Sequence, residues 1–280
     1  MTASVKISHL TLLAGRGVYP LELAHFARES GVARIDAICF RGETDSALTR
    51  LVDQSAWIHV GALDALLSKI ESFGAHDAVM VGQIQPTNLF RVRMDGSMRR
   101  LLASLPVRNA ETIFGSVGSA LHRIGVTLHP ASLFMERAMP EAGLLSERAP
   151  IGQESRDLEL GVRIAKAISG LDIGQTVIVK TGTILAVEAF EGTDQAILRA
   201  ARLGGRGGVV VKAAKQGHDM RFDIPVIGLH TFKTLKKAGI SALGVEAGRT
   251  ILLQRKELIE QARRNDIAFV ALDMKRSEET

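Results

Sequence analysis

Short apolar runs alternate with helical patterns along the first half of the chain. Four of these runs predict buried strands, at Ile7–Ala14, Ala33–Phe40, Ala56–Val60 and Asp77–Ile84. The segment 62–73 repeats leucine and isoleucine at three- and four-residue spacing, which predicts a helix, and another helix is predicted between Pro20 and Gly31. Strands that alternate with helices indicate a parallel sheet with right-handed crossovers.

The pattern changes in the middle of the chain. Residues 88–135 are predicted to be mostly helical, most clearly at Ser97–Leu105 and Glu111–Ile124. Residues 138–153 hold two prolines and two glycines with few periodic apolar positions, which is typical of a linker. We therefore expect one domain over residues 1–137 and another over residues 154–280.

The second half has a different order of elements. A helix is predicted at Asp157–Ile168, followed by a hairpin of Thr176–Thr181 and Ile184–Ala189. Five further short strands are predicted at Val209–Lys212, Pro225–Gly228, Ala242–Val245, Thr250–Leu253 and Ala268–Ala271, with helices at 193–203, 231–238 and 255–264. The predicted fold class is α/β, with an N-terminal Rossmann-like parallel-sheet domain and a C-terminal mixed α/β domain.

Composition narrows the possible classes. Of the 280 residues, 46% are hydrophobic and 23% are charged, which is enough apolar material for a sizeable core. We find no apolar stretch near the roughly 20 residues that span a bilayer, and no signal-peptide pattern at the N-terminus. The single cysteine, Cys39, cannot form an internal disulfide, so we expect a cytoplasmic protein.

The net charge of +5 favours anionic partners such as phosphates, nucleotides or an acidic membrane surface. One Trp and one Tyr supply few of the aromatic platforms on which single-stranded nucleic acid stacks. We therefore expect no nucleic-acid partner.

Two glycine-containing strand ends in the first half are candidate nucleotide contacts. Gly15, Arg16 and Gly17 follow the first strand and precede a helix, where backbone amides and the helix N-terminus favour phosphate. Pro20 stands where the third glycine of a dinucleotide-binding motif would be, so an ordinary tight turn is an equal alternative. Gln83 ends another strand at the edge where parallel sheets bind ligands, although the spacing alone favours a polar loop start.

Carboxylates and cations are denser in the second half. Glu188, Glu191 and Asp194 lie where a strand runs into a helix, so they suit a hard cation such as Mg²⁺, although Thr193 or Asp194 could simply cap that helix. Further on, cations and carboxylates interleave between two strands, and these residues are Lys212, Lys215, Asp219, Arg221 and Asp223. Such a stretch can neutralise phosphates while a carboxylate holds a metal or orients water, which we favour over a merely solvated loop. The sequence contains no P-loop, no H-E-x-x-H motif and no G-x-S-x-G elbow.

Several ordered motifs resemble one bacterial type of UDP-2,3-diacylglucosamine pyrophosphatase, unrelated to the calcineurin-like metallophosphoesterases. The matching segments are Leu13–Gly17 with Pro20, Gly82-Gln83, Leu171–Gln175, Ile184–Ala189, Glu191–Asp194, Lys212–Lys215, Asp219–Asp223, Pro225–Gly228 and Val245–Gly248. The resemblance covers about residues 9–273. The family often has three glycines where Gly15-Arg16-Gly17 stands and Lys-Pro where Lys215-Gln216 stands.

The resemblance implies hydrolysis of UDP-2,3-diacylglucosamine to UMP and 2,3-diacylglucosamine 1-phosphate in lipid A synthesis. It also implies Mg²⁺ dependence, two α/β domains, a homodimer, and peripheral association with the cytoplasmic face of the inner membrane. The essential aspartate of the family falls on Asp223.

The residue chemistry and the family resemblance together give one hypothesis for the site. Asp223, Asp194 and Lys212 are expected to be catalytic, and Asp223, Asp194 and Glu188 to hold Mg²⁺. The substrate is expected to contact Gly15, Arg16, Gly17, Gln83, Glu191, Gly192, Thr193, Lys215, Asp219 and Arg221, and helices within 97–124 to supply an apolar groove for its acyl chains.

Two other classes are weighed beside the hydrolase. A non-catalytic nucleotide-sugar binding protein on the same scaffold is opposed by the presence of Asp194 and Asp223. A nicotinamide-dependent oxidoreductase is suggested only by the glycine turn, because Phe40-Arg41 stands where a ribose-binding acid is expected and Glu43 lies further on.

Overall fold

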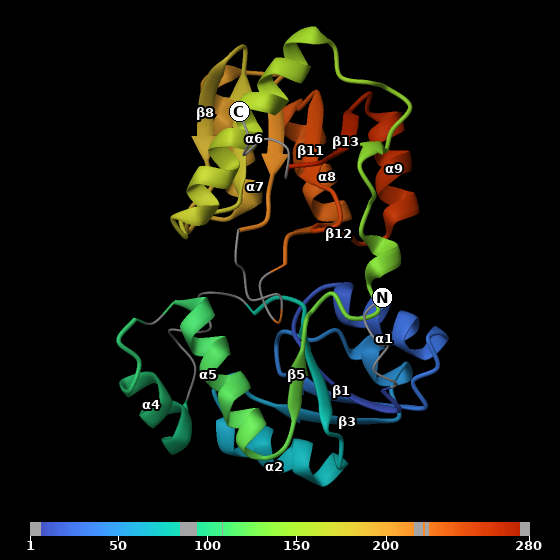
Figure 1. Ribbon diagram of the computed structural model, residues 1–280, viewed down its shortest axis with the longest axis vertical. Helices are drawn as coiled ribbons and strands as arrows, with labels where there is room; N and C mark the ends of the chain where they lie inside the picture. The colour runs from blue at the N-terminus through green and yellow to red at the C-terminus, as the bar shows by residue number, and fades with distance from the viewer. Residues whose placement is uncertain (1–6, 85–93, 108, 216–220, 222–223, 275–280) are drawn as a thin grey trace. The chain divides into compact units, whose positions relative to one another are not determined.

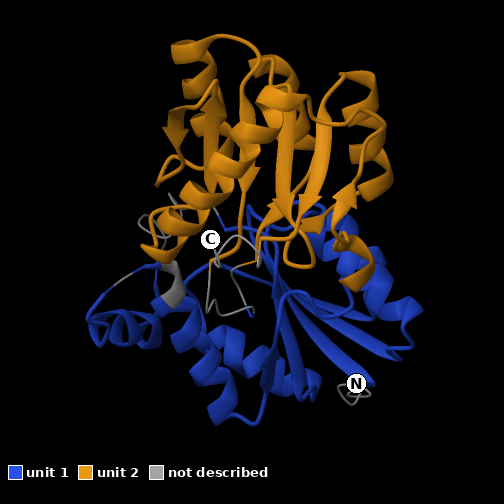
Figure 2. Cartoon of the chain, turned by 45° about the horizontal axis from the view of Figure 1, so that its top comes forward, with its two compact units in different colours: residues 1–135, 219–223 blue, residues 136–218, 224–280 orange. Residues whose placement is uncertain are grey.

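The computed structural model divides the chain into two compact units, coloured separately in Figure 2. The structure describes residues 7–84, 94–107, 109–215, 221 and 224–274. Unit 1 comprises residues 1–135 and 219–223, and unit 2 comprises residues 136–218 and 224–280. Residues 138–153, where we expected a linker, belong to unit 2.

Unit 1 is built around a five-stranded parallel sheet with the order β3-β2-β1-β4-β5 (Figure 1). Its elements are β1 (His9–Ala14), α1 (Tyr19–Glu29), β2 (Arg34–Phe40), η1 (Ser46–Arg50), β3 (Gln54–Ile58), α2 (Leu63–Phe73), β4 (Asp77–Val81), α4 (Gly96–Ala103), α5 (Ala110–Arg123) and β5 (Thr127–His129). The chain leaves β1 toward β2 on one side, and leaves β4 toward β5 on the other. The loops after β1 and β4 therefore diverge at the carboxyl edge of the sheet, which is where open α/β sheets bind ligands.

Local sequence explains where these helices begin and end. The Asp95 and Asn109 side chains accept hydrogen bonds from the amides of Met98 and Thr112, so they cap α4 and α5. Gly74 ends α2 in the left-handed conformation at φ +73°, which glycine adopts without strain. Helices α2 and α5 bury their apolar sides against the sheet face that carries Leu13 and Ile38.

Unit 2 contains a six-stranded mixed sheet with the order β6-β13-β11-β9-β7-β8, and a separate parallel pair, β10 and β12. Its elements are η2 (Glu136–Ala138), β6 (Gly143–Leu144), α6 (Gly152–Gly170), β7 (Thr176–Lys180), β8 (Thr183–Val187), α7 (Thr193–Gly204), β9 (Val209–Lys212), β10 (Val226–Ile227), α8 (Leu229–Ala238), β11 (Ala242–Glu246), β12 (Ile251–Leu252), α9 (Arg255–Arg264) and β13 (Ala268–Leu272).

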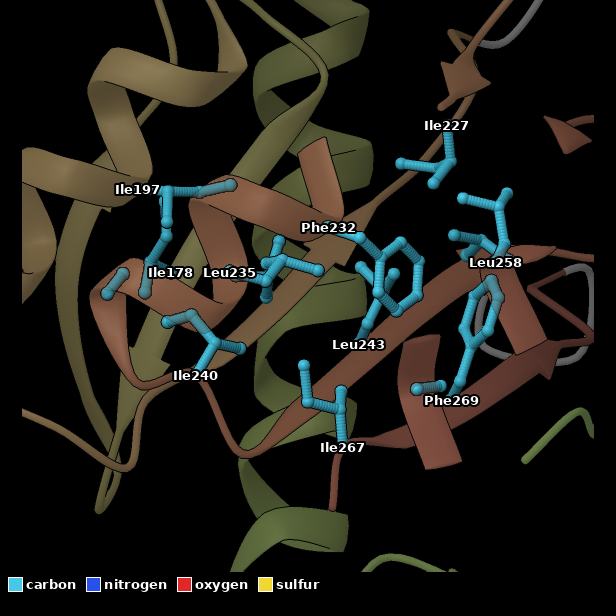
Figure 3. Close-up of a cluster of buried hydrophobic side chains, with 14 of the residues drawn as sticks. Ile178, Ile197, Ile227, Phe232, Leu235, Ile240, Leu243, Leu258, Ile267 and Phe269 are labelled. Atoms are coloured by element: carbon cyan, nitrogen blue, oxygen red, sulfur yellow. The ribbon is translucent and has the colours of Figure 1, made fainter. Parts of the chain in front are cut away.

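Alternation along the strands divides the core of unit 2 between two faces. Val210 and Leu243 pack in one cluster with α7, α8 and α9, and Figure 3 shows Phe232 and Phe269 at its centre. Those two rings meet edge to face, with centroids 5.4 Å apart. Val209 and Val211 point the other way and pack against α6. Because successive strand residues face opposite sides, each strand serves both clusters.

The predicted fold class is confirmed, as two α/β units with a parallel and a mixed sheet. The hairpin of β7 and β8 also forms as an antiparallel pair. Two short strands were not predicted: β5 lies in a region assigned as helical, and β6 lies in the expected linker. Helix α6 begins at Gly152, five residues before the predicted start, because Glu154 accepts a hydrogen bond from the Ile151 amide across its first turn.

A partly buried ion pair fixes that helix start within unit 2. Arg148 donates two hydrogen bonds to the Glu154 carboxylate, at 2.8 and 2.9 Å, and the Glu154 side chain is 10% exposed. Burial by itself raises the pKa of Glu154, but hydrogen bonds from Arg148, the Ile151 amide and Ser241 outweigh it and lower the pKa below 4.5.

We expect Glu154→Gln to lower the free energy of unfolding by about 1–3 kcal/mol at pH 7, because it weakens charge-assisted hydrogen bonds. A depressed folded-state pKa stabilises the protein above 4.5, and this contribution is lost as pH falls through the folded-state pKa. The deficit of the variant should therefore shrink below that pH. Urea unfolding at several pH values measures it, with Glu159→Gln on the exposed side of α6 as the matched control. A pH-independent deficit would contradict the assignment.

Candidate functional site

In unit 1 the ends of β1 and β4 are joined by backbone hydrogen bonds. The Arg16 amide donates to the Gln83 carbonyl at 2.6 Å, and the Gln83 amide donates to the Arg16 carbonyl at 3.2 Å. The Gly15 amide donates to the Val81 carbonyl at 2.8 Å. The amides of Gly15 and Arg16 therefore bond within the turn, whereas the Gly17 amide has no hydrogen-bond partner among the described residues.

The glycines of this turn allow the two loops to approach. A Cβ on Gly15 would lie 2.5 Å from the Gln83 carbonyl oxygen, and one on Gly82 would lie 2.7 Å from the Arg16 carbonyl oxygen. Only glycine tolerates such contacts with backbone. The structure brings Gly15–Gly17 and Gln83 together, and it explains Gly15 and Gly82 by close packing of two loops.

The Arg16 side chain is held at the turn by a buried acid. Its Nε lies 3.2 Å from Oε2 of Glu43, whose side chain is fully buried, and its Nη2 donates to the Gly42 carbonyl at 3.2 Å. Glu43 is the first carboxylate after β2, although it lies beyond the position expected for a ribose-binding acid. Because it is buried against Arg16, this geometry argues against the oxidoreductase.

An apolar cavity of about 130 Å³ adjoins the turn within unit 1. Gly15 and Gly82 form part of its wall. Its remaining lining comes from strand ends, the loop before α2, and helices α2, α4 and α5; it includes Leu13, Phe40, His59, Leu66, Met80, Met98, Leu102, Phe114 and Val117. Helices α4 and α5 fall within residues 97–124, where the sequence led us to expect an acyl groove.

In unit 2 a hydroxyl links a buried lysine to a carboxylate. Lys212 ends β9 and points to the face covered by α7, and Thr193 is the first residue of that helix. Lys212 Nζ donates to Thr193 Oγ1 at 2.9 Å, and Thr193 Oγ1 donates to Glu188 Oε1 at 2.7 Å. The other oxygen of Glu188 accepts from the Gln175 amide at 3.4 Å. The structure therefore brings Glu188, Thr193 and Lys212 together.

The neighbouring acids have different partners. Glu191 is paired with Arg199 at 2.5 Å, and the hydrogen bond from Arg199 lowers the pKa of Glu191. Asp194 Oδ2 lies 3.2 Å from His230 Nε2 at the start of α8. Asp194 Oδ1 is buried without a hydrogen-bond partner among the described residues. His230 was not among the predicted residues, because no local motif marks it.

The polar stretch after β9 is shared between the units. Lys215 Nζ lies 3.4 Å from Asp172 Oδ1 in unit 2. Arg221 belongs to unit 1, where its Nη1 lies 3.5 Å from the position that a Cβ on Gly118 of α5 would take. Asp219 and Asp223 lie outside the described residues. Among the described residues, we find no group of three His, Cys, Asp or Glu side chains placed to hold a metal ion.

The fold is that of an α/β protein of two units, with a glycine turn at a strand end in one and a buried lysine at the end of a strand in the other. Residues 9–138 match the model of the LpxI N-terminal domain, and residues 141–270 match that of the LpxI C-terminal domain. The chain belongs to the LpxI family.

A relative from Caulobacter vibrioides, UDP-2,3-diacylglucosamine pyrophosphatase LpxI, is 28% identical and the match covers 90% of this chain and 93% of the relative. Similarity to solved structures is weak. The biotin carboxylase domain of a thermophilic 2-oxoglutarate carboxylase is 14% identical with a TM-score of 0.28, over 72% of this chain and 43% of that one. A biotin carboxylase from Campylobacter jejuni also gives 0.28, at 13% identity, over 71% of this chain and 42% of that one. The chain spans less than half of the length of those two structures.

We expect Gly15→Ala to destabilise unit 1 by about 2–4 kcal/mol, because the new methyl group would force the bonded ends of β1 and β4 apart. Urea unfolding measures the change in the free energy of unfolding, and hydrogen exchange at the Arg16 amide measures the loss of protection at the turn. Gly96→Ala is the matched control in the same unit, since its Cβ meets only the flexible end of Arg100 at 3.3 Å. Equal stability of the two variants would show that the turn is not closely packed.

Proposed function

We propose that this protein is a UDP-2,3-diacylglucosamine pyrophosphatase that releases UMP and 2,3-diacylglucosamine 1-phosphate in lipid A synthesis. Membership of the LpxI family supports this, as does the printed activity of the Caulobacter vibrioides relative. The motifs quoted from the sequence extend through both family domains in order.

The observation that carries the proposal is the state of Lys212. Lys212 is 8% exposed. Among the described residues, only the neutral Thr193 hydroxyl accepts a hydrogen bond from the Lys212 ammonium. A buried cation is costly unless an anion and further hydrogen bonds accompany it. A diphosphate supplies both, so Lys212 is suited to bind phosphate oxygens at the start of α7.

In the proposed reaction, a water oxygen bonds to one phosphorus atom of the diphosphate. The bond from that phosphorus to the bridging oxygen breaks, and the bridging oxygen leaves with the other phosphate. Lys212, Lys215 and Arg221 neutralise the phosphate oxygens as negative charge shifts to the leaving group. Asp223 orients the water and accepts its proton.

The described residues fit a hard cation in part. Asp194 Oδ1 is a buried carboxylate oxygen with no partner among the described residues, which suits a cation ligand. Both oxygens of Glu188 already accept hydrogen bonds, so we infer that Glu188 acts through water or through Thr193. We propose that Asp194 and Asp223 hold Mg²⁺, which when bound polarises the phosphoryl oxygens.

We infer that unit 1 is a Rossmann-like nucleotide-binding domain. Strand order and the divergent loops after β1 and β4 support this. The Gly17 amide, the Arg16 guanidinium and the exposed Gln83 side chain are the groups proposed to contact the nucleotide. The adjoining cavity is proposed to accept an acyl chain, because its lining is mainly apolar.

Two further proposals rest on the family resemblance. These are a homodimer and peripheral attachment to the inner membrane at its cytoplasmic face. Within the described residues, no helix combines the length and apolar character needed to cross a bilayer. The exposed side chains of Leu171 and Phe190, 71% and 81% accessible, support surface attachment to lipid. Sedimentation velocity and flotation with anionic vesicles test both, and a monomer that stays with the soluble fraction would contradict them.

The activity test uses pure protein, substrate and Mg²⁺. We expect UMP release with Mg²⁺, none with EDTA, and a fall of at least about 1,000-fold in kcat for Asp223→Ala with substrate binding retained. Retained binding without any UMP release by the natural protein would instead favour the non-catalytic nucleotide-sugar binding protein. An Asp223→Ala variant with near-normal turnover would contradict the role of that residue.

We expect Met98→Trp to lower kcat/KM for the long-chain substrate by about 10–100-fold while a short-acyl analogue changes by less than about 3-fold, because the indole fills the cavity. Steady-state kinetics with both substrates measures the difference. Arg99→Trp is the matched control, since Arg99 is exposed on the same helix. Equal losses for both substrates would place the acyl chain elsewhere.

A further inference from the structure

A buried carboxylate lies behind the polar stretch that follows β9. Glu246 is the last residue of β11 and is 2% exposed. It has the strand parity of Ala242, which packs with α6, so its side chain lies on the face opposite to Lys212 and Thr193. Neither the sequence motifs nor the proposed chemistry assigns it a role.

Glu246 joins helix α6 to the chain that leaves β9. Its Oε1 accepts from Lys166 Nζ at 2.6 Å, and its Oε2 accepts from the Ala214 amide at 2.7 Å. Arg249 Nη1 lies 3.8 Å from Glu246 Oε1, and its Nη2 donates to the Lys215 carbonyl at 3.0 Å. We call Lys166, Glu246 and Arg249 the exit clamp.

The exit clamp contacts Ala214 and Lys215, the second and third residues after Lys212. The Ala213 amide is also bound, by the Gln175 carbonyl at 2.9 Å, and Lys166 Nζ reaches the Ala214 carbonyl at 3.4 Å. Residues 213–215 have left the β9 ladder, so these contacts replace the hydrogen bonds that a strand neighbour would provide. Asp223 follows eight residues after Lys215 along the same chain.

We propose that Glu246 is a positioning residue for pyrophosphate hydrolysis, acting by holding the Ala214 amide. This rests on the proposed function. With the Ala214 amide fixed, Lys212 keeps its side chain on Thr193 and the chain toward Asp223 starts in one direction. A displacement of about 1 Å at a reacting group can cost about 100-fold in rate.

The test separates this role from the stability of a buried ion pair. Lys166→Met with Glu246→Gln removes both charges but keeps a carbonyl oxygen for the Ala214 amide. Lys166→Met with Glu246→Leu removes the charges and that acceptor together. Replacing a buried ion pair by apolar groups of similar size often preserves stability, so both double variants should fold.

We expect the Leu double variant to lose about 100-fold in kcat with KM within about 3-fold, and the Gln double variant to stay within about 3-fold in both. Hydrogen exchange should show a protected Ala214 amide in the Gln variant alone. Equal kcat in the two variants, whether high or low, would overturn the proposal.

A variant of half-buried Arg249 covers the case in which the Leu double variant does not fold. Arg249→Met releases the Lys215 carbonyl while Glu246 keeps Lys166 and the Ala214 amide, and it should lower kcat by about 10-fold in a protein that stays folded. An unchanged kcat there would also overturn the proposal. If the natural protein itself released no UMP, the proposed function would be wrong. If the natural protein were active and the variants equally active, only the role of Glu246 would be wrong.

Discussion

The structure of unit 2 depends on how the Lys212 ammonium is accommodated at the end of β9. A hydroxyl carries one hydrogen, so Thr193 donates to Glu188 and accepts from Lys212. The Glu188 carboxylate is thereby connected to the Lys212 ammonium through the neutral Thr193 hydroxyl and has no direct hydrogen bond to it. This arrangement orients the lysine without neutralising it fully, which leaves an attractive field for a phosphate.

Strand alternation distributes the supporting contacts over both faces of the sheet. Lys212 points toward α7, where the start of a helix favours anions. Glu246 points toward α6 from the neighbouring strand and holds the chain just beyond Lys212. The side chains of Lys212 and Glu246 thus lie on opposite faces of the sheet. A slip of one residue in register would exchange the faces to which they point.

The sequence predicted what depends on short-range pattern. Alternating apolar runs predicted the parallel sheet, and a Gly-Thr turn predicted the hairpin of β7 and β8. Strand β5 was not predicted, because a strand of three residues is too short for its periodicity to be distinguished from that of the preceding helix. The start of α6 was predicted too late, because Pro150 and Gly152 are typical of linkers. The ion pair of Arg148 and Glu154 fixes where this helix begins.

Site residues divide in the same way. Glu188, Thr193 and Lys212 could be nominated because their residue types suit phosphate chemistry, but their hydrogen bonds join residues 5 and 19 positions apart. Arg16 and Glu43 are 27 positions apart, and Lys166 and Glu246 are 80 positions apart, so no local spacing marks either pair.

Candidate metal ligands are equally hard to predict from the sequence. Carboxylates close in sequence suggest a shared cation, yet Glu191 is paired with Arg199 and Glu188 with Thr193. Of these neighbouring acids, Asp194 has an oxygen, Oδ1, that is buried without a hydrogen-bond partner among the described residues. Residue type therefore nominates a ligand, whereas the partners that surround it in the folded chain decide whether its lone pairs are available.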